Sequence, residues 1–167
     1  MITRALWGVQ SGGPLQVFDT AIGKLGVLIC YDSEFPLLGR ALKASDLLLV
    51  PSCTAALSGY WRVRIGAMAR ALENQCVTVM ASLVGTADWS EAVDVSTGTG
   101  RVFGSPDTGF PPTGVIAEGI FNQAGWTYAD VDLAGISQVR SEGVVLGQLH
   151  WQEQAGRDKA APFVELR

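Results

Sequence analysis

The stretch LGVLICYDSEFP, residues 25–36, is where the sequence changes character most abruptly. Its first half is apolar on both faces, which is typical of a strand at the centre of a sheet. Its second half is polar and ends in a Phe-Pro pair, and proline suits the first turn of a helix. We therefore expect a strand over 25–30 that ends at Cys30, then a corner, then a short helix over 35–44.

Two further apolar runs and one long helical pattern follow this stretch. DLLLVPS (46–52) is expected to be a buried strand that stops at Pro51, and CVTVMASLVG (76–85) is expected to be a third. Between them, residues 57–74 carry apolar side chains at helical spacing. The alternation of strands and helices predicts the α/β class with a layered sheet.

The remaining elements are shorter. Strands are expected at 14–20 and 101–104, an antiparallel pair at the sheet edge from 114–119 and 126–133, and a weak helix at 133–140. We interpret residues 1–167 as one partial domain, with a core at about 8–140. Residues 141–167 are predicted to be a tail that needs another surface to become ordered.

Composition limits the possible functions. The 167 residues are 48% hydrophobic and 17% charged, with a mean hydropathy of +0.25, so we expect a partner chain to cover part of the surface. The net charge of −4 argues against a nucleic-acid partner. No apolar run approaches the roughly 20 residues of a membrane span. Three cysteines without metal-like spacing favour free thiols in a reducing, cytoplasmic setting, and no metal or cofactor is predicted.

Cys30 has two readings on pattern alone. Ligands of open α/β sheets bind beyond the carboxyl ends of strands, where the backbone N–H of Tyr31 can face the same space as the sulfur and supply one oxyanion donor. A thiol that titrates near pH 8.5 would also need an activating base or cation. Alternatively, Cys30 is simply the last core residue of its strand, because free cysteine is among the most buried residue types.

A family resemblance favours the nucleophile. GVLICYDSEFP resembles the nucleophile segment of the nitrilase superfamily, the carbon–nitrogen hydrolases, and ARALENQ (69–75) is similar to the family's Arg-Ala-x-Glu-Asn segment. The resemblance stays in register through LLLVPSC, SLVG, RVFG and PPTGVIAEG to WTYADVDL, and it covers about residues 8–140. It implies an αββα layered sandwich, represented here by its C-terminal portion, that forms a homodimer or higher oligomer through a helical face.

The resemblance also implies a chemistry. Such enzymes attack an amide, nitrile or carbamoyl carbon of a small molecule with the cysteine, form a thioester or thioimidate, and hydrolyse it with water. Their catalytic set is Glu, Lys and Cys: glutamate acts as the general base, and lysine stabilises the oxyanion together with the backbone N–H after the cysteine. Mapped onto this chain, Cys30 is the nucleophile and Tyr31 provides that N–H.

The sequence departs from the family upstream of the cysteine. The family's lysine and glutamates precede the nucleophile, yet the 29 residues before Cys30 contain no Glu, and Lys24 is their only lysine. Lys24 begins the strand that Cys30 ends, so strand geometry separates the two by about 20 Å. We therefore expect the C-terminal half of a nitrilase-like enzyme that lacks its N-terminal half, and negligible amidase activity from the chain alone.

Two acidic residues lie close to the nucleophile. Glu34 could face the substrate, pair with Arg40 or Arg64, or act as a helix-start acid stabilised by the helix dipole. Asp32 is expected to accept hydrogen bonds from local backbone N–H groups at the corner, which is a structural role.

Several other residues have competing readings. Glu73 is predicted to form an ion pair with Arg70 rather than to act as a base, because it lies at a helix end and the family's base comes from upstream. Cys53 and Thr54 follow a neighbouring strand, so they either line the substrate pocket or pack within a loop. Cys76 is expected in the core.

The aromatic residues and the single histidine carry weaker signals. Trp61, Trp89 and Trp126 could shape a pocket, although aromatic residues usually bury area. His150, isolated in the tail, is not expected to be catalytic, so a papain-like Cys–His mechanism is not favoured. A class I glutamine amidotransferase is the least favoured alternative, because its Gly-x-Cys-x-Gly elbow is absent. A non-catalytic nitrilase-like interaction module remains the alternative to an enzyme.

Overall fold

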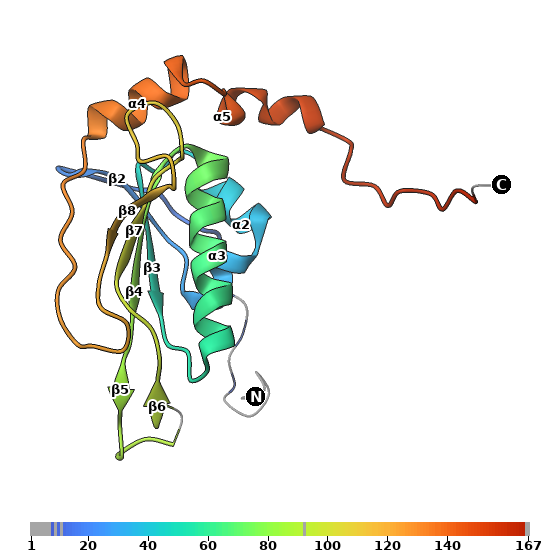
Figure 1. Cartoon of the computed structure of the whole chain (residues 1–167). Coiled ribbons are helices and arrows are strands. Elements are labelled where there is room, and N and C mark those ends of the chain that lie inside the picture. The colour runs from blue at the N-terminus through green and yellow to red at the C-terminus, as the bar shows by residue number, and fades with distance from the viewer. Residues whose placement is uncertain (1–7, 9, 11, 92, 166–167) are drawn as a thin grey trace.

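The computed structural model describes residues 8, 10, 12–91 and 93–165 and is built around a twisted sheet (Figure 1). The strands are β1 (Phe18–Thr20), β2 (Gly23–Val27), β3 (Leu47–Ser52), β4 (Val77–Ser82), β5 (Gly85–Thr86), β6 (Val95–Ser96), β7 (Arg101–Phe103) and β8 (Val115–Glu118). Six of them form one sheet in the order β1-β2-β3-β4-β7-β8, and β5 pairs with β6 separately. Strands β2, β3 and β4 are parallel, so their carboxyl ends lie at one edge.

Two helices cover one face of this sheet. The helices are α2 (Pro36–Ala41), α3 (Leu57–Asn74), α4 (Leu133–Glu142) and α5 (Gly147–His150), with 3-10 turns η1 (Cys30–Glu34) and η2 (Trp151–Gln154). Figure 1 shows α2 and α3 on the same side of the sheet. Helix α3 has the bounds that its periodicity predicts and ends where Gln75 adopts a left-handed backbone conformation with φ of 45°. Across the described residues, none of the helices combines the length and apolarity of a membrane span.

The main core lies between α3 and the sheet. Alternation along β3 directs Leu48 and Val50 toward α3, where they meet Val63 and Ala67 from the helix. The residues buried in this cluster are Leu28, Leu42, Leu48, Val50, Tyr60, Val63, Ala67, Ala71, Cys76, Met80 and Phe103. Cys76 is therefore a core residue, as predicted.

The opposite face of the sheet is covered less completely. Val77, Val102 and Ile136 form a second buried cluster there, and Leu47 and Val79 pack against it while remaining only partly buried. The segment 126–132 runs beside the sheet on the side away from α3 and leads into α4 (Figure 1). Val131 of this segment, Leu133 and Ile136 of α4, and Phe110 from the loop after β7 cover part of this face.

The predicted antiparallel pair of 114–119 with 126–133 is wrong. Strand β8 pairs with β7 instead, with Arg101 opposite Glu118, and residues 126–132 form no strand. The apolar alternation that suggested a strand is used for cover, because Val131 and Leu133 pack against the second cluster. The predicted strand at 101–104 and helix at 133–140 are both present, as β7 and α4.

Several element ends differ from the predicted ones. The strand expected at 14–20 is confined to β1, and the helix expected at 35–44 is the shorter α2. Strand β2 ends before Cys30 because the chain leaves the sheet after Leu28, whose N–H makes the last hydrogen bond to β3. Pro51 does not stop β3. The pairing of β2 with β3 ends at Val27 and Leu49, so Pro51 has no partner in β2 and pairs only with Ala81 of β4. A proline is tolerated at such an edge position.

Part of the predicted tail is anchored by polar contacts. The Gln75 side chain donates to the carbonyl oxygens of Val139 and Val145, both at 2.9 Å, and accepts from the Gln148 N–H at 3.0 Å. The Gln148 side chain in turn donates to the carbonyl of Lys43 at 2.7 Å. These contacts hold α5 near the carboxyl end of α3, while the chain beyond η2 extends away from the body (Figure 1).

Helix α3 approaches η1 too closely for any side chain at Gly66. A Cβ there would lie 2.7 Å from the carbonyl oxygen of Ser33, which is backbone and cannot rotate away. Gly66→Ala gains up to about 1 kcal/mol of helix propensity but incurs about 1–3 kcal/mol of overpacking. We expect a net loss of about 1–2 kcal/mol in the free energy of unfolding, measured by urea denaturation. Gly147→Ala, with open space around its Cβ, is the control and should change little. Equal or greater stability of Gly66→Ala would contradict the close approach.

Candidate active site around Cys30

The backbone turns sharply at Cys30. Strand β2 ends at Val27, the Leu28 N–H still bonds the Leu49 carbonyl at 2.9 Å, and Cys30 then opens η1 with φ of 50°. A left-handed φ is uncommon for a residue other than glycine and costs free energy that the surroundings must offset. The corner predicted after the strand is thus a strained turn that sets the thiol at the carboxyl edge of the parallel strands.

Local hydrogen bonds hold this turn. The Asp32 carboxylate accepts from the Ile29 N–H at 3.1 Å, and the Asp32 N–H donates back to the Ile29 carbonyl at 3.0 Å. The Ser33 hydroxyl donates to the Cys30 carbonyl at 2.7 Å. Asp32 therefore has the backbone contact that the sequence predicts, and Ser33 adds one that it does not.

An ion pair on α3, with its arginine buried and its glutamate partly exposed, supports the turn. The Arg70 side chain is 3% exposed, donates to both oxygens of the Glu73 carboxylate at 2.9 and 2.8 Å, and donates to the Ser33 carbonyl at 2.8 Å. The predicted pair of Glu73 with Arg70 is present. The contact of Arg70 with Ser33 was not predicted, although the ARALENQ segment indicates that Arg70 and Glu73 lie on one helix.

Glu34 pairs with an arginine that the sequence reading did not name. Its carboxylate lies 3.2 Å from the Arg62 Nε, and neither Arg40 nor Arg64 contacts it. Arg64 instead lies over the ring of Trp61. The predicted partners are wrong because the residues of α3 that lie over η1 are four positions apart along the helix: Arg62, Gly66 and Arg70.

The residues after β3 adjoin the nucleophile. The Cys30 thiol donates to the Cys53 carbonyl at a distance of 3.7 Å, and the exposed Cys53 thiol lies 3.5 Å from the Ser96 hydroxyl. Thr54 is buried and donates to the Thr97 carbonyl at 2.9 Å, while the Thr97 N–H donates back to the Thr54 carbonyl. The Thr54 side chain is thus packed within a loop, whereas the Cys53 side chain is exposed.

Tyr31 has its backbone N–H available. No acceptor for this N–H is found in the described part of the chain, and the Tyr31 ring is half exposed and packs edge-on against Phe35 at 4.8 Å. Within the same residues, the Cys30 thiol makes no hydrogen bond to a lysine, a histidine or a carboxylate. Lys24 bonds Asp46 through its N–H near the start of β2, and His150 lies in α5.

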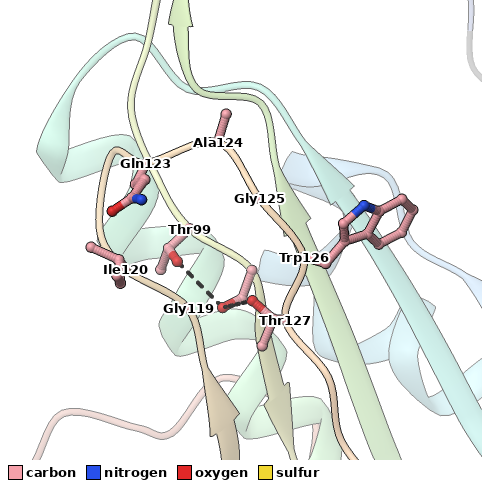
Figure 2. Close-up of a pocket in the computed structure, with 9 residues that line it drawn as sticks. Thr99, Gly119, Ile120, Gln123, Ala124, Gly125, Trp126 and Thr127 are labelled. Atoms are coloured by element: carbon pink, nitrogen blue, oxygen red, sulfur yellow. Dashed lines mark hydrogen bonds between the residues drawn. The ribbon is translucent and has the colours of Figure 1, made fainter.

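A pocket elsewhere in the structure is separate from the Cys30 thiol. A hollow of about 120 Å³ lies between Thr99–Gly100 and the loop 119–127, with Gln123 and Thr127 on its walls (Figure 2). Trp126 borders it, but no residue of η1 does. Trp61, Trp89 and Trp126 are 44%, 84% and 86% exposed. Among the described residues, no group of three or more His, Cys, Asp or Glu is arranged to hold a metal ion.

Comparison with known proteins identifies the family. The sequence model of the carbon-nitrogen hydrolases matches residues 1–153. This chain belongs to that family. The predicted membership of the nitrilase superfamily and the predicted αββα fold class are both confirmed, because solved nitrilase-superfamily proteins share its fold.

Three relatives illustrate the match. The chain is 38% identical over 144 residues to a probable hydrolase, YhcX, of Bacillus subtilis, covering 85% of this chain and 28% of that protein. It is 42% identical over 80 residues to a deaminated glutathione amidase of Yersinia enterocolitica, covering 46% and 27%. The NitFhit protein of C. elegans superposes with a TM-score of 0.65 at 29% identity, covering 78% and 30%. The chain therefore spans about a quarter of the length of the two curated relatives.

Another solved structure concerns the cysteine directly. A mutant amidase from Nesterenkonia sp. AN1 superposes with a TM-score of 0.60 at 27% identity, covering 86% of this chain and 49% of that one. That structure shows covalent addition of the acetamide moiety of fluoroacetamide at the active-site cysteine.

The third cysteine has a distinct environment that can be tested. Burial raises the pKa of the Cys76 thiol from 9.0 to about 12, Asp46 adds to the rise and Arg140 opposes it. The folded state thus favours the neutral thiol, so this stability is complete below pH 9 and is lost as pH rises toward 12. In the folded protein we expect iodoacetamide to spare Cys76 at pH 8 and to label it only after unfolding. Cys76→Ala should weaken the loss of stability above pH 9. Labelling of native Cys76 as fast as exposed Cys53 would contradict this.

Proposed function

We propose that this chain carries the nucleophile of a hydrolase acting on non-peptide carbon–nitrogen bonds: amide, nitrile or carbamoyl. The observation that carries the proposal is the thiol of Cys30 on a left-handed turn at the sheet edge, with the Tyr31 N–H unpaired beside it, in a chain of this family. The adduct at the active-site cysteine of the Nesterenkonia amidase supports the role of the thiol.

The proposed reaction has two stages. For an amide, the Cys30 sulfur attacks the carbonyl carbon and gives a tetrahedral oxyanion, to which the Tyr31 N–H donates a hydrogen bond. The C–N bond then breaks, the amine leaves with a proton returned by the general base, and a thioester remains. Water attacks the thioester, the C–S bond breaks, and the acid is released with the thiol restored.

The base and the second oxyanion donor are proposed to come from outside this chain. The 29 residues before Cys30 contain no Glu, and Lys24 is placed at the far end of β2. We propose that a missing N-terminal half of the domain supplies the glutamate and the lysine. The partly buried sheet face around Leu47 and Val79 offers it a surface. The limited span of the chain along its relatives is consistent with this.

The alternative function is a non-catalytic nitrilase-like interaction module. It is favoured by the lack, among the described residues, of any charged partner for the Cys30 thiol. Under this alternative the turn at Cys30 is retained as part of the fold and has no acyl-transfer chemistry.

Acylation of the thiol distinguishes the two. With p-nitrophenyl acetate at pH 8.5, we expect peptide mapping to find an acetyl group on Cys30 sooner than on Cys53, because the proposed oxyanion donor, the Tyr31 N–H, follows Cys30 on a turn that Asp32 and Ser33 hold in place. Simple amides should give negligible ammonia, since the amine leaves only with general-acid help. Acetylation of Cys53 alone would overturn the nucleophile assignment. Ammonia release that disappears in Cys30→Ala would show instead that the chain contains its own base.

We also propose that the protein is cytoplasmic and forms a homodimer or higher oligomer. Free thiols support the location. Leu57, Trp61 and Ile65 follow a spacing of four along α3 and are 53%, 44% and 61% exposed, which is a large apolar surface for an uncovered helix.

A charge on this stripe should separate the subunits. Ile65→Arg is expected to lower the mass measured by light scattering to that of a monomer, while Arg62→Gln, on the neighbouring η1-facing side, should leave the mass unchanged. A monomeric wild-type chain, or an oligomer that Ile65→Arg leaves intact, would exclude the α3 stripe as the interface.

A further inference from the structure

The peptide between Cys30 and Tyr31 contains both a carbonyl that the protein binds and the proposed oxyanion donor. In a trans peptide the C=O and the following N–H point in opposite directions. Whatever fixes the Cys30 carbonyl therefore also aims the Tyr31 N–H. The Ser33 hydroxyl donates to that carbonyl at 2.7 Å, and Ser33 is fully buried.

Ser33 is itself held on two sides by α3. Arg70 donates to the Ser33 carbonyl at 2.8 Å, and the same guanidinium is clamped by both oxygens of Glu73. Gly66 lets the helix backbone approach so closely that Ser33 has no room to move toward it. A continuous set of contacts thus runs from the Arg70–Glu73 pair through the buried Ser33 to the Cys30–Tyr31 peptide.

The hydrogen bonds of the 3-10 turn alone hold the Cys30–Tyr31 peptide weakly in one orientation. Hydrogen bonds in 3-10 helices have poorer geometry than those of α-helices, and Cys30 is at a strained left-handed φ of 50°. A rotation of this peptide plane changes ψ of Cys30 and φ of Tyr31, and it would turn the Tyr31 N–H in another direction. The Ser33 hydroxyl and the Arg70 guanidinium oppose the rotation.

We propose that Ser33 and Arg70 are positioning residues that orient the Cys30–Tyr31 peptide so that its N–H faces the developing oxyanion. This rests on the proposed function of Cys30. Neither side chain touches the substrate: both act through the backbone. Arg70 anchors Ser33, and Ser33 anchors the carbonyl opposite the donor.

Two reactions of the same thiol separate this role from general stability. Acylation by p-nitrophenyl acetate passes through a tetrahedral oxyanion, whereas alkylation by iodoacetamide displaces iodide and forms none. Peptide mapping after timed quenching gives both rate constants for Cys30, distinct from those for Cys53. Loss of the orienting contact should slow acylation and leave alkylation nearly unchanged.

For Ser33→Ala we expect acylation of Cys30 to fall about tenfold, less than the roughly 100-fold or greater effect of deleting an oxyanion donor outright. Arg70→Lys cannot bind Glu73 and Ser33 together and should act in the same direction. Ser141→Ala is the matched control: its exposed hydroxyl donates to the Ser137 carbonyl at 3.1 Å on α4. It should change neither rate.

The outcomes decide between explanations. Unchanged acylation in both Ser33→Ala and Arg70→Lys, or a parallel fall in acylation and alkylation, would overturn the positioning role. If wild-type Cys30 is alkylated but never acylated, the proposed function fails, and the Tyr31 amide signal in ¹H–¹⁵N spectra then tests the orientation by itself. Broadening or splitting of that signal in Ser33→Ala supports the proposal, and a sharp, unshifted signal refutes it.

Discussion

The left-handed backbone at Cys30 is the constraint on which the rest of the site depends. A φ of 50° is unfavourable for cysteine, on the order of 1 kcal/mol or more, and persists only where the surroundings over-determine it. Here the Asp32 carboxylate, the Ser33 hydroxyl and the Arg70 guanidinium each bind one backbone group of the turn. The turn places the thiol at the strand edge, and Arg70 of helix α3 holds the turn through Ser33.

Helix α3 is therefore more than a cover for the sheet. One of its faces contributes Val63, Ala67 and Ala71 to the main core, and another presents Arg62, Gly66 and Arg70 to η1. The same helix thus determines both how the sheet is buried and how the nucleophile turn is supported. A change in its packing would alter both together.

The three cysteines show how environment assigns different chemistry to one residue type. Cys76 is sealed in the core, where burial raises the pKa of its thiol and keeps it neutral. Cys53 is exposed beside the Ser96 hydroxyl, and Cys30 occupies the strained turn with an N–H donor nearby. The reactivity of each thiol follows from its environment, and the proposed chemistry requires the environment of Cys30.

Local sequence patterns determined a large part of this protein. Helical spacing predicted α3 with its correct bounds, apolar runs predicted the three parallel strands, and the Cys30 segment indicated the family, because each of these signals depends on neighbouring residues. Only the tertiary structure decided which elements meet: that β8 pairs with β7, that Pro51 is tolerated where β2 has departed, and that Glu34 contacts Arg62. It also decided that Arg70 reaches Ser33, 37 residues away in the chain. Such partners depend on how helix and sheet pack, which no local periodicity encodes.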